Sequence, residues 1–162
     1  MTVRAEGRMT NHMLIRCGPG DVFSVLADGY LLSGWIHEGS RVQGLDQAWP
    51  LPGSKSRHAS RLGPIPLHDG AAIIEWDPPR HMVLTIHGRL VGSTLITLDV
   101  ERGANGCLAH LTETVVRGPG LLVPPPIRRA GLHLQNGERL QRLARLAETR
   151  AERPGAGRRS YV

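Results

Sequence analysis

The stretch PPPIRRAGLHLQNGERLQRLARLAETRA, residues 124–151, decides the fold because it predicts one long amphipathic helix near the end of the chain. Its apolar residues recur at helical spacing and form a mostly continuous stripe, with arginines and glutamates opposite. The stripe consists of Ile127, Leu132, Leu134, Leu140, Leu143, Leu146 and Ala147. We expect the helix to start after the three prolines at 124–126, to make about six turns and to end before Pro154.

Upstream of this helix, the chain changes to short segments separated by turn residues, which is typical of an antiparallel meander. Strands are predicted at 40–45, 55–62, 71–77, 82–90, 93–101 and 107–116. Pro and Gly residues punctuate the connections, and Gly63-Pro64, Asp69-Gly70, Val91-Gly92 and Asn105-Gly106 are each expected to form a turn. The pattern therefore predicts hairpin-connected strands.

The first part of the chain predicts a strand at 9–15, followed by two short helices at 21–27 and 30–36. A sheet needs its apolar face covered, and only the C-terminal helix is large enough to cover it. The fold class is therefore predicted as α+β, with a curved antiparallel sheet of six to seven strands wrapped around the long helix. Such an arrangement often leaves a concave apolar pocket between its two layers.

Length and composition indicate one domain. The chain has 162 residues, of which 40% are hydrophobic and 21% charged, as in ordinary globular proteins. We expect a single ligand-binding domain at 9–150, a disordered N-terminus at 1–8 and a disordered basic tail at 151–162. The net charge of +6 is partly carried by these ends, and a single lysine and 4% aromatic residues argue against nucleic-acid binding.

Other classes of site are absent from the sequence pattern. No apolar run approaches the roughly 20 residues that span a bilayer, and Met1–Met9 lacks a signal-peptide pattern, so we expect a cytoplasmic protein without stable membrane insertion. Cys17 and Cys107 are too few for a disulfide or zinc scaffold and are interpreted as reduced packing residues. The eight histidines are scattered singly, so neither a metal site nor a cofactor is predicted.

Several stretches, in the same order along the chain, carry a family resemblance that spans about residues 9–150. They are Val22-Phe23-Ser24-Val25-Leu26-Ala27-Asp28 with Trp35, Trp49-Pro50-Leu51-Pro52-Gly53-Ser54, His58 with Gly63-Pro64-Ile65-Pro66-Leu67 and Asp69, Glu75-Trp76-Asp77-Pro78-Pro79-Arg80, Glu113 with Gly118-Pro119-Gly120, and Asn136-Gly137-Glu138-Arg139-Leu140-Gln141-Arg142-Leu143. In this order the chain resembles the polyketide cyclase/dehydrase-like members of the START-like superfamily, also called SRPBCC proteins. The resemblance implies a helix-grip fold and roles that range from lipid carriage to aromatase/cyclase chemistry. One departure is Arg57-His58, where members often carry two adjacent histidines.

Glu113 and His58 are the candidate catalytic residues. Strand alternation places Glu113 on the inward face, where a carboxylate suits proton transfer or holds a ligand group. The alternative is a glutamate at the cavity rim, paired with Arg117 or another arginine. If His58 points inward, its imidazole suits a general base or a ligand anchor, and the alternative is a structural hydrogen bond to backbone.

The inner faces of the predicted strands and helices supply the candidate ligand-contacting residues. These are Trp35, Ile73, Leu84, Ile86, Ile96, Leu98, Leu111, Leu132 and Asn136. Alternation places His87 and Arg89 on the outer face, although a shift of one residue would exchange the faces. Ile73 and Glu75 share one face and Ile74 the other, and the pattern leaves open which of them is the inner one.

Together these features predict a protein that binds a hydrophobic small molecule, lipid-like, aromatic or polyketide-like, between the sheet and the long helix. Two functions fit. One is a cofactor-independent cyclase or dehydratase in which Glu113 or His58 relays a proton. The other is a non-catalytic carrier or sensor, and a homodimer through a sheet edge is compatible with both.

Overall fold

The computed structural model describes residues 8–36, 40–88 and 92–153. The predicted positions of Arg89, Leu90 and Val91, and the expected disorder at 1–7 and 154–162, lie outside the described residues.

A single seven-stranded sheet forms the larger layer of the fold, and all of its strand pairs are antiparallel. Its strands are β1 (Arg8–Ile15), β2 (Arg41–Leu45), β3 (Lys55–Leu62), β4 (Ile65–Asp77), β5 (His81–Gly88), β6 (Gly92–Gly103) and β7 (Gly106–Arg117). They lie in the order β1-β7-β6-β5-β4-β3-β2. The strands β2 to β7 therefore form the predicted meander, and β1 closes it as the opposite edge strand.

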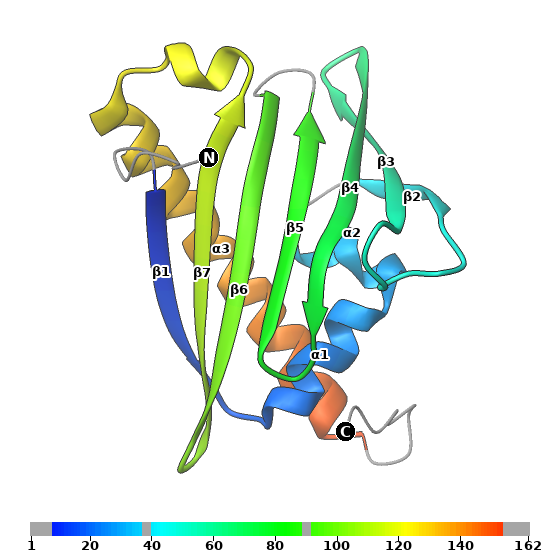
Figure 1. The fold of residues 1–162 in the computed structure, drawn as a ribbon, viewed down its shortest axis with the longest axis vertical. Coiled ribbons are helices and arrows are strands. Elements are labelled where there is room, and N and C mark those ends of the chain that lie inside the picture. The colour runs from blue at the N-terminus through cyan, green and yellow to red at the C-terminus, as the bar shows by residue number, and fades with distance from the viewer. Residues whose placement is uncertain (1–7, 37–39, 89–91, 154–162) are drawn as a thin grey trace.

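The helices lie on one side of this curved sheet (Figure 1). Between β1 and β2 the chain forms α1 (Pro19–Ala27), η2 (Gly29–Leu31) and α2 (Leu32–Trp35), and after β7 it forms η3 (Pro119–Leu122). The long helix α3 (Pro125–Ala151) runs across the sheet and packs on β1, β7, α1 and α2. The prediction of an α+β helix-grip fold is confirmed.

Two predicted boundaries are wrong. The helix α3 begins at Pro125 and not after Pro126, because proline is tolerated in the first turn, where its missing N–H has no partner to lose. Asp69-Gly70 is not a turn but lies within β4, paired with β3 in a register that continues to Leu62↔Ile65. The turn between β3 and β4 lies at the predicted Gly63-Pro64, and Gly63 has a φ of 59°, in the left-handed region that glycine adopts readily.

The apolar stripe predicted for the long helix is also wrong at two positions. Leu132, Leu140 and Leu143 are buried against the sheet, as expected, but Ile127 is 64% exposed and Leu134 is 70% exposed. At 100° per residue, Ile127 and Leu134 lie on the side of α3 opposite to the buried leucines. The helix therefore has a buried apolar face along its length and a second, exposed apolar face near its start.

A β-bulge in β4 decides the face that alternation left open. The register shifts between Ile73, opposite Leu84, and Glu75, opposite Val83. Because the bulge inserts one extra residue, Ile73 faces the core while Glu75 is exposed on the outer side. Trp76 then turns inward and packs against Phe23, with ring centroids 5.3 Å apart. His87 is exposed, as predicted.

Candidate functional site

A cavity of about 240 Å³ lies between the sheet and α3. Five strands, β3 to β7, and the helix α3 supply its walls: Ser60, Leu67, Asp69, Ile86, Gly88, Gly92, Thr94, Glu113, Leu132, Gln135 and Arg139. The walls combine aliphatic side chains with two carboxylates, Asp69 and Glu113, and one guanidinium, Arg139. The curvature of the sheet positions these strands around α3, so residues far apart in the sequence meet there.

A buried ion pair joins the helix to the sheet at this cavity. Arg139 Nη1 on α3 donates to Glu113 Oε2 on β7 at 2.7 Å, and each side chain is only 2% exposed. The alternative in which Glu113 pairs with an arginine is therefore the one observed, with Arg139 as the partner instead of Arg117. Because both charges are removed from water, each depends on the other and on nearby polar groups.

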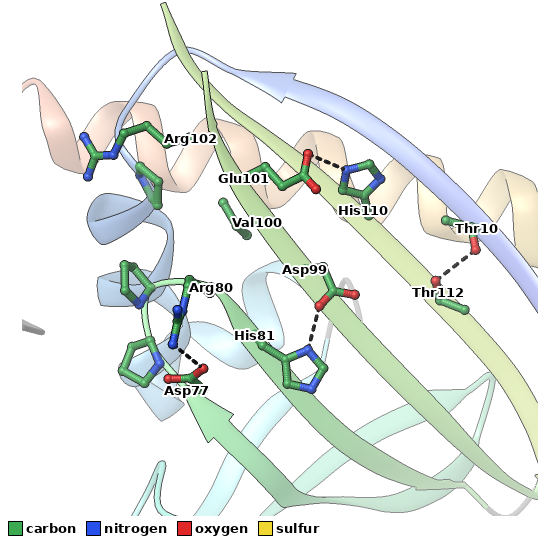
Figure 2. Close-up of a pocket in the computed structure, with 13 residues that line it drawn as sticks. Thr10, Asp77, Arg80, His81, Asp99, Val100, Glu101, Arg102, His110 and Thr112 are labelled. Carbon is green, nitrogen blue, oxygen red and sulfur yellow. Dashed lines mark hydrogen bonds and ion pairs between the residues drawn. The ribbon is translucent and has the colours of Figure 1, made fainter. Parts of the chain in front are cut away.

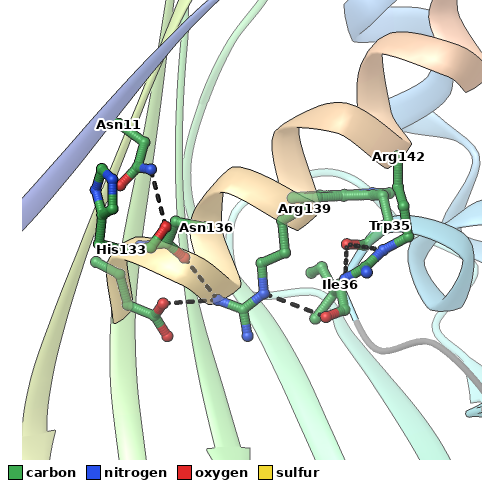
Figure 3. Close-up of polar contacts among 8 residues, drawn as sticks. Asn11, Trp35, Ile36, His133, Asn136, Arg139 and Arg142 are labelled. Atoms are coloured by element: carbon green, nitrogen blue, oxygen red, sulfur yellow. Dashed lines mark hydrogen bonds and ion pairs between the residues drawn. The ribbon is translucent and has the colours of Figure 1, made fainter. Parts of the chain in front are cut away.

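The guanidinium of Arg139 is held in place by two further acceptors (Figure 3). Nη1 also donates to Asn136 Oδ1 at 3.1 Å, and Nε donates to the carbonyl oxygen of Ile36 at 3.2 Å. One turn along α3, Arg142 donates to the carbonyl oxygen of Trp35. The two arginines thus satisfy carbonyl groups at the end of α2, where a positive charge is favourable.

One nitrogen of the Arg139 guanidinium and one oxygen of the Glu113 carboxylate are available to bind a ligand. Arg139 Nη2 and Glu113 Oε1 have no hydrogen-bond partner among the described residues, and both side chains line the cavity. A guanidinium offers five N–H donors, so a ligand oxygen can bind Nη2 without displacing Glu113. The arrangement can hold a polar group at the end of an otherwise apolar ligand.

Two buried asparagines fix the position of Arg139 and of the helix that carries it: Asn136 accepts a hydrogen bond from Arg139, and Asn11 ties β1 to α3. Asn136 is fully buried on α3, and its Nδ2 has no partner among the described residues. Asn11 on β1 donates from Nδ2 to the carbonyl oxygen of His133 at 3.0 Å, so the edge strand is tied to the helix. Asn136 thus orients Arg139 and does not itself line the cavity.

The predicted ligand-contacting residues divide into two groups. Ile86 and Leu132 line the cavity together with Glu113. The others are packed in the core, at exposures of 2% or less, and are not among the residues of the cavity wall: Trp35, Ile73, Leu84, Ile96, Leu98 and Leu111. The cavity is consequently smaller than a pocket lined by all of these side chains would be.

His58 is buried on the inner face of β3 but is not among the residues of the cavity wall. Its Nε2 is 2.8 Å from Ser56 Oγ, and its Nδ1 has no partner among the described residues. Burial lowers the pKa of His58, against a smaller opposing effect of Asp69. Ser60, two residues along the same face of β3, lines the cavity with Glu113, but His58 does not.

Sequence reasoning missed Arg139, which carries the polar contacts of the cavity. A signal was present, because Arg139 lies seven residues after Leu132 and directly before Leu140, on the stripe that faces the sheet. Asn136 lies on the same face. Two polar residues within an apolar helical stripe indicate a buried polar site.

A larger hollow, of about 1120 Å³, lies on the outer face of the sheet (Figure 2). Three residues form a row across adjacent strands in this hollow: His81 on β5 lies opposite Asp99 on β6, which lies opposite His110 on β7. His81 Nδ1 is 2.6 Å from Asp99 and its Nε2 is 2.8 Å from Glu75, and these contacts raise the pKa of His81. In the part of the chain that the structure describes, no three His, Cys, Asp or Glu residues are arranged to hold a metal ion.

Comparison with known proteins finds similarity in structure only, because no protein-family model and no curated protein matches the sequence. A protein of unknown function from Staphylococcus aureus has a TM-score of 0.73 at 12% identity, with 90% of this chain and 96% of that one covered. The di-domain ARO/CYC StfQ from the steffimycin biosynthetic pathway has a TM-score of 0.68 at 12% identity, covering 92% of this chain and 52% of StfQ. Ara h 8.0201 has a TM-score of 0.65 at 13% identity, covering 90% of this chain and 97% of that one. These likenesses establish a shared fold.

Proposed function

We propose that this chain, which has the helix-grip fold of the SRPBCC and polyketide cyclase-like proteins, binds a compact hydrophobic molecule with one polar end in the cavity between its sheet and α3. The observation that carries the proposal is the buried Glu113–Arg139 pair, which lines the cavity with one donor and one acceptor uncommitted. The ligand's apolar body contacts Ile86 and Leu132. Its polar end accepts a hydrogen bond from Arg139 Nη2.

The energetics of buried charges support a functional role for this pair. Removing two charges from water is costly, and well-packed apolar residues often replace a buried ion pair without loss of stability. A pair retained at the wall of a cavity is therefore better explained by ligand recognition than by stability. Burial also strengthens a hydrogen bond from Arg139 to a ligand oxygen, because water competes less.

The cavity volume restricts the size of the ligand. At about 240 Å³ it lies just below the roughly 300–1,000 Å³ of sites for drug-sized molecules. A ligand of one or two rings, or a short acyl chain, fits this volume. A larger polyketide-like or lipid-like ligand requires core side chains such as Ile96 or Leu111 to move aside.

Acid–base chemistry at Glu113 is a second candidate function, favoured by the uncommitted Oε1 at the cavity wall and by the fold shared with StfQ. In this reaction Glu113 takes a proton from the carbon next to a ligand carbonyl, and Arg139 stabilises the negative charge that develops on the carbonyl oxygen. In a cyclisation the resulting enolate carbon bonds to a second carbonyl carbon of the same ligand, and that carbonyl oxygen takes the proton back from Glu113. In a dehydration the enolate expels a β-hydroxyl group, which leaves as water with the proton from Glu113. His58, which is not part of the cavity wall, has a structural role in this scheme.

Native mass spectrometry of the freshly purified protein tests the binding proposal. We expect an apolar compound with a carbonyl, carboxylate or phenol group to leave on denaturation, and to rebind to the empty protein. Glu113→Gln and Arg139→Met should each weaken rebinding at least about tenfold, as expected for the loss of a charge-assisted hydrogen bond. Leu14→Ser, on the outer face of β1, is the matched control and should rebind normally.

The same material separates binding from catalysis. If the bound compound is converted on incubation, Glu113→Gln should abolish conversion while His58→Gln retains it. Unchanged conversion by Glu113→Gln would exclude the acid–base role and leave a carrier or sensor. Rebinding that is unaffected by both Glu113→Gln and Arg139→Met would contradict the cavity proposal itself.

A further inference from the structure

Five exposed apolar side chains lie on the segment formed by η3, Val123 and the first three turns of α3. Their exposed fractions are 86% for Leu122, 70% for Leu134, 64% for Ile127, 48% for Leu121 and 37% for Val123. We call this surface the η3–α3 patch. Single exposed leucines are ordinary, but adjacent ones mark an interaction surface.

The geometry of α3 presents these residues outward. Ile127 and Leu134 are seven residues apart and share the helix face opposite to the core, with Ala130 between them. Pro124–Pro126 precede them and are exposed as well. In Figure 1 η3 and the first turn of α3 lie at the end of the molecule beside the start of β1, and the helix then passes behind the sheet. Leu134 lies where α3 already packs on β1, on the side of the helix away from the sheet.

The charge around the patch has a single sign. Between Thr114 and Gly137 the sequence contains three arginines, at 117, 128 and 129, and neither aspartate nor glutamate. Arg117 and Arg129 are exposed, and Arg128 donates to the carbonyl oxygens of Leu121 and Val123. Acidic residues appear on α3 only from Glu138 onward. The charged side chains of this segment are therefore all basic, and Arg128 is the one that contacts η3 directly.

We propose that the η3–α3 patch docks onto an anionic lipid bilayer. Apolar side chains enter the boundary between headgroups and acyl chains, while arginines beside them contact lipid phosphates. A second copy of this chain is a poorer partner, because it would bring two basic surfaces together. No helix among the described residues is long and apolar enough to cross a membrane.

The η3 end of the patch lies near the cavity wall, whereas Leu134 lies on the side of α3 opposite to cavity residue Leu132. Arg117 lies opposite Ser93 in the sheet, next to cavity residue Gly92. Docking therefore brings the cavity close to the phase in which a hydrophobic compound concentrates. The docking proposal does not depend on the identity of that compound.

Vesicle co-sedimentation tests the docking proposal. The full chain should bind vesicles of phosphatidylcholine with phosphatidylglycerol more tightly than vesicles of phosphatidylcholine alone, and salt should weaken this binding. Leu122→Ser should weaken it about tenfold, from the loss of a buried leucine side chain. Arg117→Gln should weaken it about fivefold, from the loss of one basic contact.

Two matched variants control for the chemistry of these changes. Leu14→Ser changes a leucine that is 76% exposed on β1, and Arg102→Gln changes an exposed arginine near the β6–β7 turn at the other end of the molecule. Both should bind vesicles like the unmodified chain. Circular dichroism and thermal unfolding establish that all four variants are folded.

Three results would overturn the proposal. The first is absence of any preference for anionic vesicles, and the second is an equal loss of binding in Leu14→Ser and Leu122→Ser. The third is a concentration-dependent dimer, seen by light scattering, that Leu122→Ser abolishes, because the patch would then be covered by a second copy.

Discussion

Replacing Arg139 by methionine tests the central interaction of the candidate site. Methionine keeps much of the side-chain length but removes the charge, so the Glu113 carboxylate, 2% exposed, is left buried without its partner. Unit charges about 4 Å apart attract by about 4 kcal/mol at the effective dielectric constant that suits protein sites. Breaking a buried pair on one side generally costs about 3–5 kcal/mol. We expect Arg139→Met to lower the free energy of unfolding by a similar amount, measured by urea denaturation followed by circular dichroism.

Two further variants make the interpretation specific. Combining Arg139→Met with Glu113→Leu removes both charges, and the part of the lost stability that comes from the unpaired Glu113 carboxylate should return, although the bonds to Asn136 and Ile36 stay lost. Arg80→Met is the surface control: its partner Asp77 is 3.0 Å away, but the two side chains are 74% and 57% exposed, so the cost should stay below about 1 kcal/mol. A double variant no more stable than Arg139→Met would refute the reasoning, as would equal effects at positions 139 and 80.

Three other outcomes follow from the structure. The pKa of His81 is raised, first of all by its hydrogen bond to Asp99. The stability lost in His81→Asn should therefore be largest below the pKa of histidine in the unfolded chain, about 6.5, and should become smaller as the pH rises through the pKa of His81 in the folded protein. A stability difference that stays constant in urea denaturation from acid to alkaline pH would contradict this. Burial raises the pKa of Cys17 to about 12 and of Cys107 to about 11. Neither thiol should therefore react with a disulfide reagent near neutral pH until the protein unfolds. Fast reaction of the folded protein would be evidence against buried thiols. Gly106→Ala should lower the urea midpoint more than Gly53→Ala. Both glycines have positive φ, 147° and 89°, so backbone strain is common to the two changes. An added Cβ at position 106 would collide with the carbonyl oxygen of Ile15 on the edge strand β1, whereas at position 53 it meets nothing within 4 Å. Equal midpoints would contradict the collision.

The elements of the fold were predictable from local patterns. Turn residues separate the strands, and period-two alternation identifies their inner faces. The predicted bounds of β3, β6 and β7 therefore agree with the observed bounds to within two residues. The start of β4 was not, because Asp69-Gly70 favours a turn in isolation but pairs with β3 when a neighbouring strand is present. Pairing between strands is a property of the whole sheet and outweighs such local preferences.

The site was predictable only in part. Alternation along β7 was enough to predict that Glu113 points inward. Its partner Arg139 lies on α3, and no local pattern in the sequence indicates which residue of a helix contacts which strand. Arginine is also more often on the solvated face of a helix, which concealed Arg139 within the stripe. For His58, the nearby Ser56 is on the same face of β3, two residues away, so this contact was within reach of the sequence pattern.

The order of strands across the sheet has a consequence for how the chain is made. The first strand, β1, pairs only with β7, and its residue Arg8 meets Thr114. During synthesis from the N-terminus, β1 is therefore without its partner until β7 has been made, while each hairpin from β3 to β7 completes as soon as its second strand is present. The contacts of α3 with β1, including Asn11 to His133, form later still. The residues of β1 thus join the native sheet after the hairpins that follow them in the sequence.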